Sequence, residues 1–213
     1  MLNELIPIFG TRIKSLEILS LLQNKKPVVR QGFYDDELKI VKKFCKKNNL
    51  FIEISDIKIK ILDKNIKFSN KGIIAKENEI GMRFVYISKD EYLAVKSHYY
   101  EIVHDHKNLG KFLGYPKCCS EFFSNNFDSE SDLNNIFIEK AAKDSNLYSY
   151  YNNILNRHKD YALIFHFPCK FDCKESIKIG KNNLNLLDNK NKKEFINNLK
   201  GKFNLKKEIL EFK

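Results

Sequence analysis

No apolar run in this sequence approaches the roughly 18 residues that a membrane-spanning helix requires. The opening residues, MLNELIPIFGTRIK, lack the basic start and the apolar core of a secretory signal. Five cysteines are an odd number and do not form the framework of a small secreted protein, so reduced thiols are expected. These absences predict a cytoplasmic protein with no membrane partner.

Several motifs of common enzymes are also missing. The sequence contains neither the G-x-x-x-x-G-K-[ST] nor the G-x-G-x-x-G phosphate loop, and it has no G-x-S-x-G nucleophile elbow. Nucleotide hydrolysis and serine hydrolysis are therefore disfavoured. No internal repeat and no Gly/Ser linker interrupts the 213 residues. We expect one domain over residues 1–213, with a helical and β portion at 1–88 and a cysteine-containing portion at 89–213.

Arginine is scarce, although the chain is basic. The net charge is +11, yet Arg occurs only at positions 12, 30, 83 and 157. From Lys170 onward there are 12 Lys and six acidic residues, which leaves a net charge of +6 in this region. Lysine is a flexible point charge, whereas arginine is the usual reader of phosphates and bases. RNA binding through this Lys-rich C-terminal region is therefore one alternative, and a genome bias toward Lys, Asn and Ile is the other.

The periodicity of apolar residues predicts the elements of the N-terminal half. Residues 11–23 and 35–47 have the apolar stripes of helices, and Cys45 lies on the second stripe, which places it in the core. Between residues 50 and 88 the pattern changes to short β-branched segments separated by turns. This change predicts a small antiparallel sheet.

The C-terminal half reads as helical with one buried strand. Helices are predicted at 89–108, 116–126, 132–143 and 148–157, and again in the tail. The continuous apolar run at 162–167, ALIFHF, is typical of a strand covered on both faces. The fold class predicted is therefore α+β, mostly helical, with a small sheet near 50–88 and a buried strand near 162–167.

Two cysteine segments about fifty residues apart contain the residues best suited to special chemistry: GYPKCCSEFF at 114–123 and HFPCKFDCKES at 166–176. Pro116 suits a helix start, so Cys118 and Cys119 would lie where free N–H groups and the helix dipole favour a thiolate. Together with His166, these segments offer five donors that suit Zn²⁺ or an iron–sulfur cluster.

The second segment adds three donors. Cys169 and Cys173 are four residues apart, so a helix that begins near Pro168 would place both sulfurs on one face. His166 would lie at the C-terminal end of the buried strand, where open sheets tend to present ligands. Adjacent side chains diverge, however, so we expect Cys118 or Cys119, rather than both, to bind one ion. No C-x₂-C pair occurs.

Two other interpretations of these positions stay open. Cys119 and Cys173 fit apolar helix stripes and would then be ordinary small core residues. His104-Asp105-His106 resembles a metal or acid–base group, but residues two apart on a helix point to different faces, which favours a solvated helix end.

The motifs G-Y-P-x-C-C-x-x-F-F at 114–123 and H-F-P-C-x-F-D-C-x-x-S at 166–176 resemble a prokaryotic, largely archaeal family known as domain of unknown function 483. The resemblance covers the C-terminal half. It implies no particular activity, but it marks Cys118, Cys119, His166, Cys169 and Cys173 as the positions of interest. Lys170 stands where the resemblance leads us to expect a small residue such as Ser.

These observations lead to three hypotheses. The first is a zinc or iron–sulfur site formed by Cys118 or Cys119, Cys169 and Cys173, with His166 as fourth ligand or as a neighbour that orients a ligand. The second is metal-free thiol redox or nucleophilic chemistry, and the third is a basic RNA-binding module. Whether the protein is an enzyme is left open, because a closed structural site and an open catalytic site use the same residues.

Overall fold

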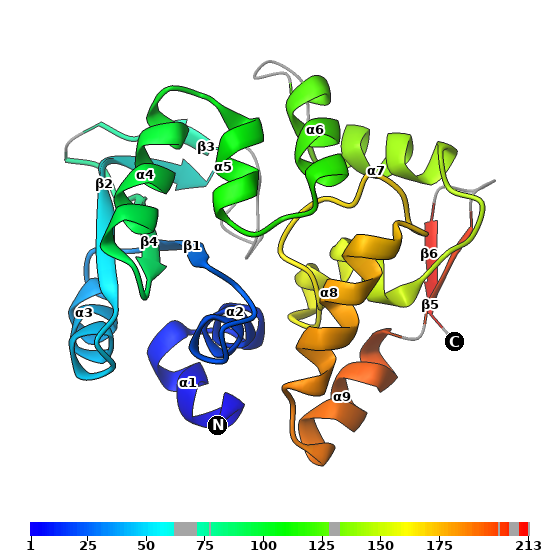
Figure 1. Cartoon of the computed structure of the whole chain (residues 1–213), viewed down its shortest axis with the longest axis horizontal. Helices are drawn as coiled ribbons and strands as arrows, with labels where there is room; N and C mark the ends of the chain where they lie inside the picture. Colours follow the sequence, from blue (N-terminus) through cyan, green and yellow to red (C-terminus); the bar gives the residue numbers. More distant parts are fainter. Residues whose placement is uncertain (62–71, 77, 128–132, 200, 205–208, 213) are drawn as a thin grey trace.

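A computed structural model describes every residue except 62–71, 77, 128–132, 200, 205–208 and 213 (Figure 1). Among the described residues, no helix is both long and apolar enough to cross a lipid bilayer. The helices and strands are α1 (Leu2–Phe9), α2 (Arg12–Leu22), β1 (Val28–Phe33), α3 (Leu38–Lys47), β2 (Phe51–Ile61), β3 (Gly72–Ile74), β4 (Met82–Ser88), α4 (Glu91–Ile102), α5 (His106–Phe112), α6 (Lys117–Asn126), α7 (Leu133–Lys143), the 3₁₀ helices η1 (Tyr150–Asn152) and η2 (Ile154–Lys159), α8 (Lys174–Asn185), α9 (Asn189–Leu199), β5 (Gly201–Asn204) and β6 (Ile209–Phe212).

The sheet confirms the α+β class. Its strand order is β1-β4-β2-β3, and every neighbouring pair is antiparallel. The sheet predicted at 50–88 is therefore present, and the part of this prediction that falls on residues 62–71 lies outside the described residues. Edge strand β1 was not predicted, because Arg30 and Gln31 interrupt its apolar pattern. A separate hairpin pairs β5 with β6.

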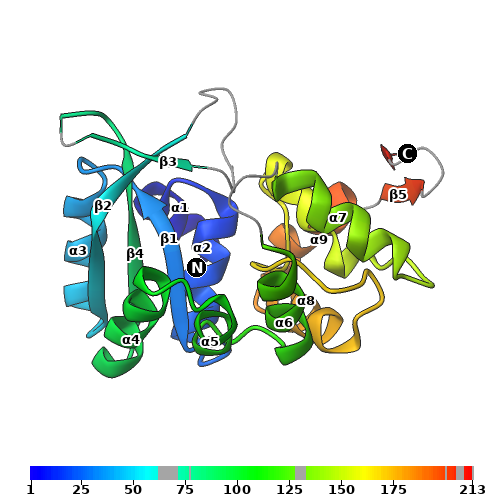
Figure 2. The same ribbon diagram turned by 90° about the horizontal axis from the view of Figure 1, so that it is seen from above.

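Helices cover both faces of the sheet (Figure 2). Because side chains alternate along a strand, Val29, Phe33 and Ile87 enter the core formed with α1, α2 and α3. Val28 and Tyr86 point the other way and pack with residues of α4 and α5. Both faces of β1 and β4 are thus buried, which fixes the register of this pair of strands.

The C-terminal helices share the first of these cores. Leu184 of α8 and Phe195 of α9 lie in the same buried cluster as Leu2 of α1 and Leu19 of α2. A second cluster, which includes Phe137 and Phe167, packs around α7 and the segment before α8. The part of the chain that carries the second cysteine segment is therefore held against the N-terminal helices.

The buried strand predicted at 162–167 is wrong. Ala162, Leu163 and Ile164 are fully buried, but the segment has no strand pairing and runs irregularly between η2 and α8. Its backbone bonds to a side chain instead, since the Leu163 carbonyl accepts a hydrogen bond from Asn183 Nδ2 at 2.8 Å. A continuous apolar run reports burial, which a strand and an irregular segment can share.

Two predicted helices are divided. The helix expected at 89–108 stops at Ile102, because His104 adopts a left-handed φ of 55° and the Asp105 carboxylate caps α5 by accepting from Asn108 N at 3.0 Å. The helix expected at 148–157 is replaced by η1 and η2. The predicted helices at 11–23, 35–47, 116–126 and 132–143 are confirmed within a few residues.

Gly110 allows α5 and α6 to approach closely. A Cβ atom at this position would lie 2.4 Å from Ser120 Oγ and 2.8 Å from Ser120 Cβ. Ser120 directly follows Cys119 on α6. The contact therefore sets the position of the helix that carries the first two cysteines.

We expect Gly110→Ala to lower the free energy of unfolding by about 1–3 kcal/mol, because the added methyl group overlaps Ser120. Urea unfolding measures the change. Ser120→Gly removes both close atoms, so the double variant should lose less stability than the sum of the two single variants. Additive losses would contradict the proposed contact.

Candidate metal centre

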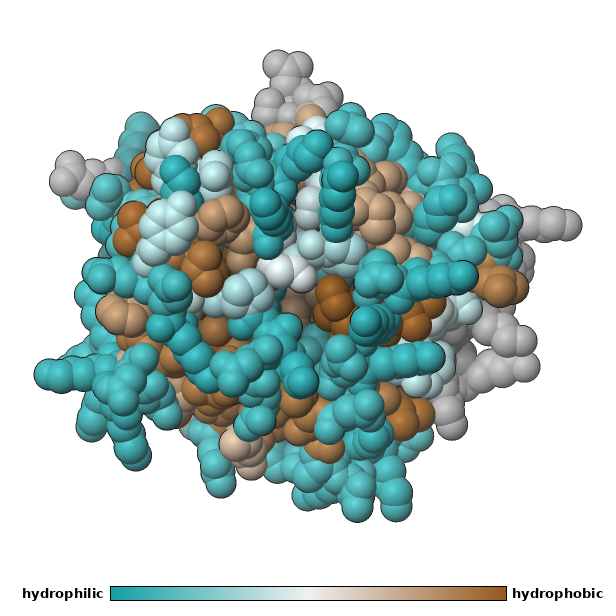
Figure 3. Space-filling model, viewed as in Figure 1, coloured by the Kyte–Doolittle hydropathy of each residue, from teal (hydrophilic) through white to brown (hydrophobic). Residues whose placement is uncertain are grey.

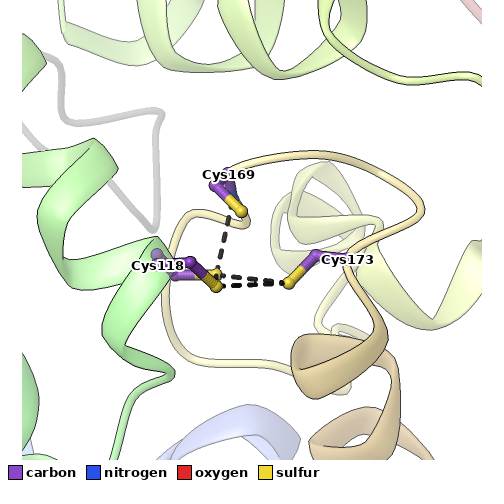
Figure 4. Close-up of side chains that lie close together, drawn as sticks. Cys118, Cys169 and Cys173 are labelled. Carbon is purple, nitrogen blue, oxygen red and sulfur yellow. Dashed lines mark hydrogen bonds between the residues drawn. The ribbon is translucent and has the colours of Figure 1, made fainter.

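The structure brings the two cysteine segments together at the starts of two helices. Pro116 is the N-cap of α6, which places Cys118 and Cys119 in its first turn, and Cys173 is the N-cap of α8. Cys169 lies in the loop before α8. Figure 4 shows the side chains of Cys118, Cys169 and Cys173 directed toward a common centre.

The four sulfur atoms form a tight group, called here the four-cysteine cluster (Cys118, Cys119, Cys169 and Cys173). Cys118 Sγ lies 3.9 Å from Cys119 Sγ and 3.7 Å from Cys173 Sγ. Cys119 Sγ and Cys173 Sγ are 3.8 Å apart, and all four sulfurs lie within 4.8 Å of one another. Two segments that are about fifty residues apart in sequence thus meet at one point.

The structure differs from two local expectations about the geometry of these cysteines. Cys118 is exposed and Cys119 is buried, yet both sulfurs belong to the cluster, because Cys173 lies within reach of both neighbouring side chains. The helix expected near Pro168 begins instead at Lys174, so Cys169 and Cys173 do not share a helix face. They converge because the intervening loop turns back on itself.

The helix starts give the cluster a favourable electrostatic position. The first N–H groups of a helix have no partner within the helix, and the macrodipole places partial positive charge there. The backbone N–H of Cys169 also donates to Cys119 Sγ at 3.4 Å. These groups stabilise negative charge on sulfur, which is the form that binds metal.

The thiols of the cluster do not share this charge equally. Hydrogen bonds from the thiols of Cys119 and then Cys169 lower the pKa of Cys173, and the backbone N–H of Ser176 lowers it further. The pKa of Cys119 is raised, first by its hydrogen bond with Cys169 and then by that with Cys173. Within the cluster, negative charge is therefore favoured on Cys173 over Cys119.

Buried polar side chains hold the loop that carries Cys169 and Cys173. Asn152, which is fully buried, donates from Nδ2 to the carbonyls of Phe171 at 3.1 Å and Cys173 at 3.2 Å. The N–H of Phe171 donates to Ser145 Oγ at 2.7 Å. Sequence reasoning missed Asn152 and Ser145, and no motif marks them, since their role depends on the folded loop.

His166 lies outside the four-cysteine cluster. Its Nε2 is 2.9 Å from Ser176 Oγ, and its ring packs on that of Tyr115 with centroids 5.0 Å apart. Burial, and then the charge of Lys26, lower the pKa of His166 to about 3, so the ring is neutral. Ser176 belongs to the first turn of α8, so His166 supports the helix that starts at Cys173.

The remaining candidate groups occupy other surroundings. Cys45 is fully buried in the first core, as predicted. Asp105 caps α5, and the ring of His106 packs on Phe127 with centroids 4.2 Å apart. A metal ion could be held by a group of three or more His, Cys, Asp or Glu side chains that lie close together. Among the described residues, the four-cysteine cluster is the one such group.

The model of one protein family, described as "Protein of unknown function (DUF483)", matches residues 34–206. The match includes all four cysteines of the cluster and also most of the sheet, so it extends well beyond the C-terminal half. The comparisons with curated proteins and with solved structures gave no match. They offer no support for RNA binding by the Lys-rich region. The described lysines of this region on α8 and α9 lie mainly on solvent-exposed faces.

We expect iodoacetamide to label Cys118 first in native, metal-free protein, because Cys118 is the exposed one of the five free cysteines. Cys45 should resist labelling, since it is fully buried and burial raises its pKa to about 12. Peptide mass spectrometry at increasing reaction times measures the order, and a denatured sample provides the control. Equal labelling of all five thiols in the native protein would show that the accessibilities described are incorrect.

Proposed function

Because the chain belongs to the DUF483 family of proteins of unknown function, we propose its function from the four-cysteine cluster: the thiolates of Cys118, Cys119, Cys169 and Cys173 bind a single Zn²⁺ ion. The observation that carries this proposal is the spacing of the sulfurs. Four Zn–S bonds of about 2.3 Å in tetrahedral geometry require sulfurs about 3.8 Å apart. The separations of 3.7, 3.8 and 3.9 Å among the sulfurs of Cys118, Cys119 and Cys173 meet this requirement, and Cys169 Sγ lies within 4.8 Å of the other three.

The same spacing favours one ion over an iron–sulfur cluster. In a cluster with several irons, the cysteine thiolates bind different iron atoms and stand on the outside of the cluster. Their sulfurs are then farther apart than four sulfurs that share one ion. A mutual separation within 4.8 Å therefore supports a mononuclear site, for which zinc and a single iron are the tetrahedral candidates.

The surroundings favour the charge of such a site. Zn²⁺ with four thiolates has a net charge of −2. The start of α6 and the start of α8 both direct positive helix ends toward it. Lys117, Lys170 and Lys174, each exposed and each next in sequence to a cysteine of the cluster, add positive charge nearby. Lys170, which stands where a small residue was expected, would thus help to balance the negative charge of the site.

The complete ligand set indicates a structural role for the ion. Four protein thiolates fill a tetrahedral site, whereas a catalytic zinc keeps one position for water or substrate. We propose that the ion joins α6 to the loop before α8, and that His166 supports α8 without binding the metal. Closing a loop of about fifty residues restricts the unfolded chain, so metal binding contributes to folding free energy.

Metal-free thiol chemistry is the second candidate. Its supporting observations are the exposure of Cys118 and the lowered pKa of Cys173, whose sulfurs lie 3.7 Å apart. In that case one thiol would act as nucleophile and a neighbour would resolve it. Measuring the metal content of the purified protein distinguishes the zinc site from metal-free thiol chemistry.

We expect protein purified without oxygen to contain one zinc per chain, measured by elemental analysis with an ultraviolet–visible spectrum. Cys169→Ala should lose most of this zinc, because three thiolates leave the site incomplete. Cys45→Ala, a matched change in the core, and His166→Gln should retain it. Removing zinc with a chelator should lower stability by about 3–4 kcal/mol if zinc is present at 100 to 1,000 times its Kd.

If the protein instead contained one iron per chain and absorbed visible light, the ion bound by the same thiolates would be iron and not zinc. A folded protein without metal, in which Cys169→Ala changes nothing, would overturn the metal proposal and leave thiol chemistry in its place. Loss of zinc in His166→Gln with an unchanged fold would show that His166 is a ligand.

We further expect Asn152→Asp to weaken zinc binding by about tenfold or more, because the carboxylate cannot donate to the carbonyls of the Phe171–Cys173 loop. Competition with a chromophoric chelator measures the Kd. Asn183→Asp is the matched control, since it also removes a buried amide donor, here to the Leu163 carbonyl, away from the cluster. Both variants should lose stability, but a zinc affinity reduced equally in both would contradict a positioning role for Asn152.

A further inference from the structure

Helix α4 has an apolar face that the rest of the described chain leaves about half exposed. Its buried side meets the sheet through Ala94, Ser97 and His98. The opposite side exposes five large apolar residues with exposed fractions between 46% and 63%: Tyr92, Val95, Tyr99, Ile102 and Val103. A helix at the surface of a globular protein normally has a polar outer face, and one that is apolar all round is buried. This surface therefore needs a partner.

The spacing of these residues suits a second helix. Tyr92, Val95, Tyr99 and Ile102 are separated by three, four and three residues, which is the a/d pattern of a helix–helix seam. The seam continues toward α5, because the Tyr92 ring lies 6.3 Å from that of Phe112. Figure 3 shows pale and brown side chains gathered over α4, in the upper left of the view.

We propose that the partner is a second copy of this chain, with the two α4 helices antiparallel across a two-fold axis near residue 97. This alignment places Tyr92 against Ile102 of the second copy, and Val95 against Tyr99 of the second copy. Every layer then pairs one large aromatic residue with one smaller β-branched residue, which fills the seam evenly. A parallel alignment would instead place tyrosine on tyrosine and leave gaps between the aliphatic residues.

Charge also favours the antiparallel arrangement. It sets the positive end of each α4 macrodipole beside the negative end of the other helix. Glu91, exposed at the start of α4, comes near His104 of the second copy, which is exposed beyond the end of its α4. Lys107 is also exposed there, but it already pairs with Glu121 of its own chain. Lys96 packs on the rings of Tyr99 and Tyr100, so its charge lies beside the seam rather than within it.

The contact is small, so the dimer should dissociate on dilution. A helix of 12 residues is about 18 Å long and provides less area than a standard interface. In sedimentation equilibrium we expect the mass to approach twice 25.1 kDa at high micromolar concentration and to fall toward 25.1 kDa at low concentration. A mass of 25.1 kDa at every concentration overturns the proposal.

The variant Ile102→Glu tests whether the apolar face of α4 forms the dimer interface. Placing a carboxylate in the seam should weaken the dimer by at least about tenfold. Ile40→Glu is the matched control, because Ile40 is an isoleucine with 44% exposure on another helix, α3. Circular dichroism establishes that both variants fold. Equal weakening by the two variants, or none by Ile102→Glu, overturns the assignment of the interface to α4.

Mixing two variants tests the orientation. Val95→Lys and Tyr99→Glu should each weaken the dimer when alone. Their mixture should recover it, because the antiparallel alignment places residue 95 of one copy opposite residue 99 of the other and joins the new lysine to the new glutamate. Absence of recovery, with both variants folded, overturns the antiparallel alignment.

Discussion

Four thiol groups held within 4.8 Å of one another set the main constraint on this molecule. Like charges at such distances repel strongly, so the four sulfurs cannot all ionise unless a cation lies between them. The thiols reflect this limit, since the pKa of Cys173 is lowered while that of Cys119 is raised. One tetrahedral ion would remove the conflict and use every sulfur.

The fold is arranged so that this constraint can be met. Gly110 lets α5 and α6 approach, which positions Cys118 and Cys119. On the other side, Asn152 holds the loop that ends at Cys173. Phe122 and Phe123 of α6 pack against the core cluster that contains Phe167 and Phe171, so the two cysteine segments are anchored to the same cluster. The proposed ion therefore joins elements that the core already brings near each other.

The two proposals concern different parts of the surface. The four-cysteine cluster lies at the starts of α6 and α8, whereas α4 lies on the sheet at the other side of the molecule (Figure 1). One depends on thiolate chemistry and the other on apolar packing. Zinc removal and α4 variants should thus act separately, unless loss of zinc unfolds the protein.

Periodicity and residue type by themselves determined the α+β class, most helices, the sheet near 50–88 and the choice of the two cysteine segments as the candidate site, because amphipathic patterns and rare soft donors are local properties of a sequence. Only the tertiary structure decided that both adjacent cysteines reach one point, that His166 bonds to Ser176, and that residues 162–167 are irregular. The sequence also contained no indication that Asn152 holds the loop before α8. These features depend on contacts between residues far apart in the chain, and a local pattern records burial without recording which neighbour provides it.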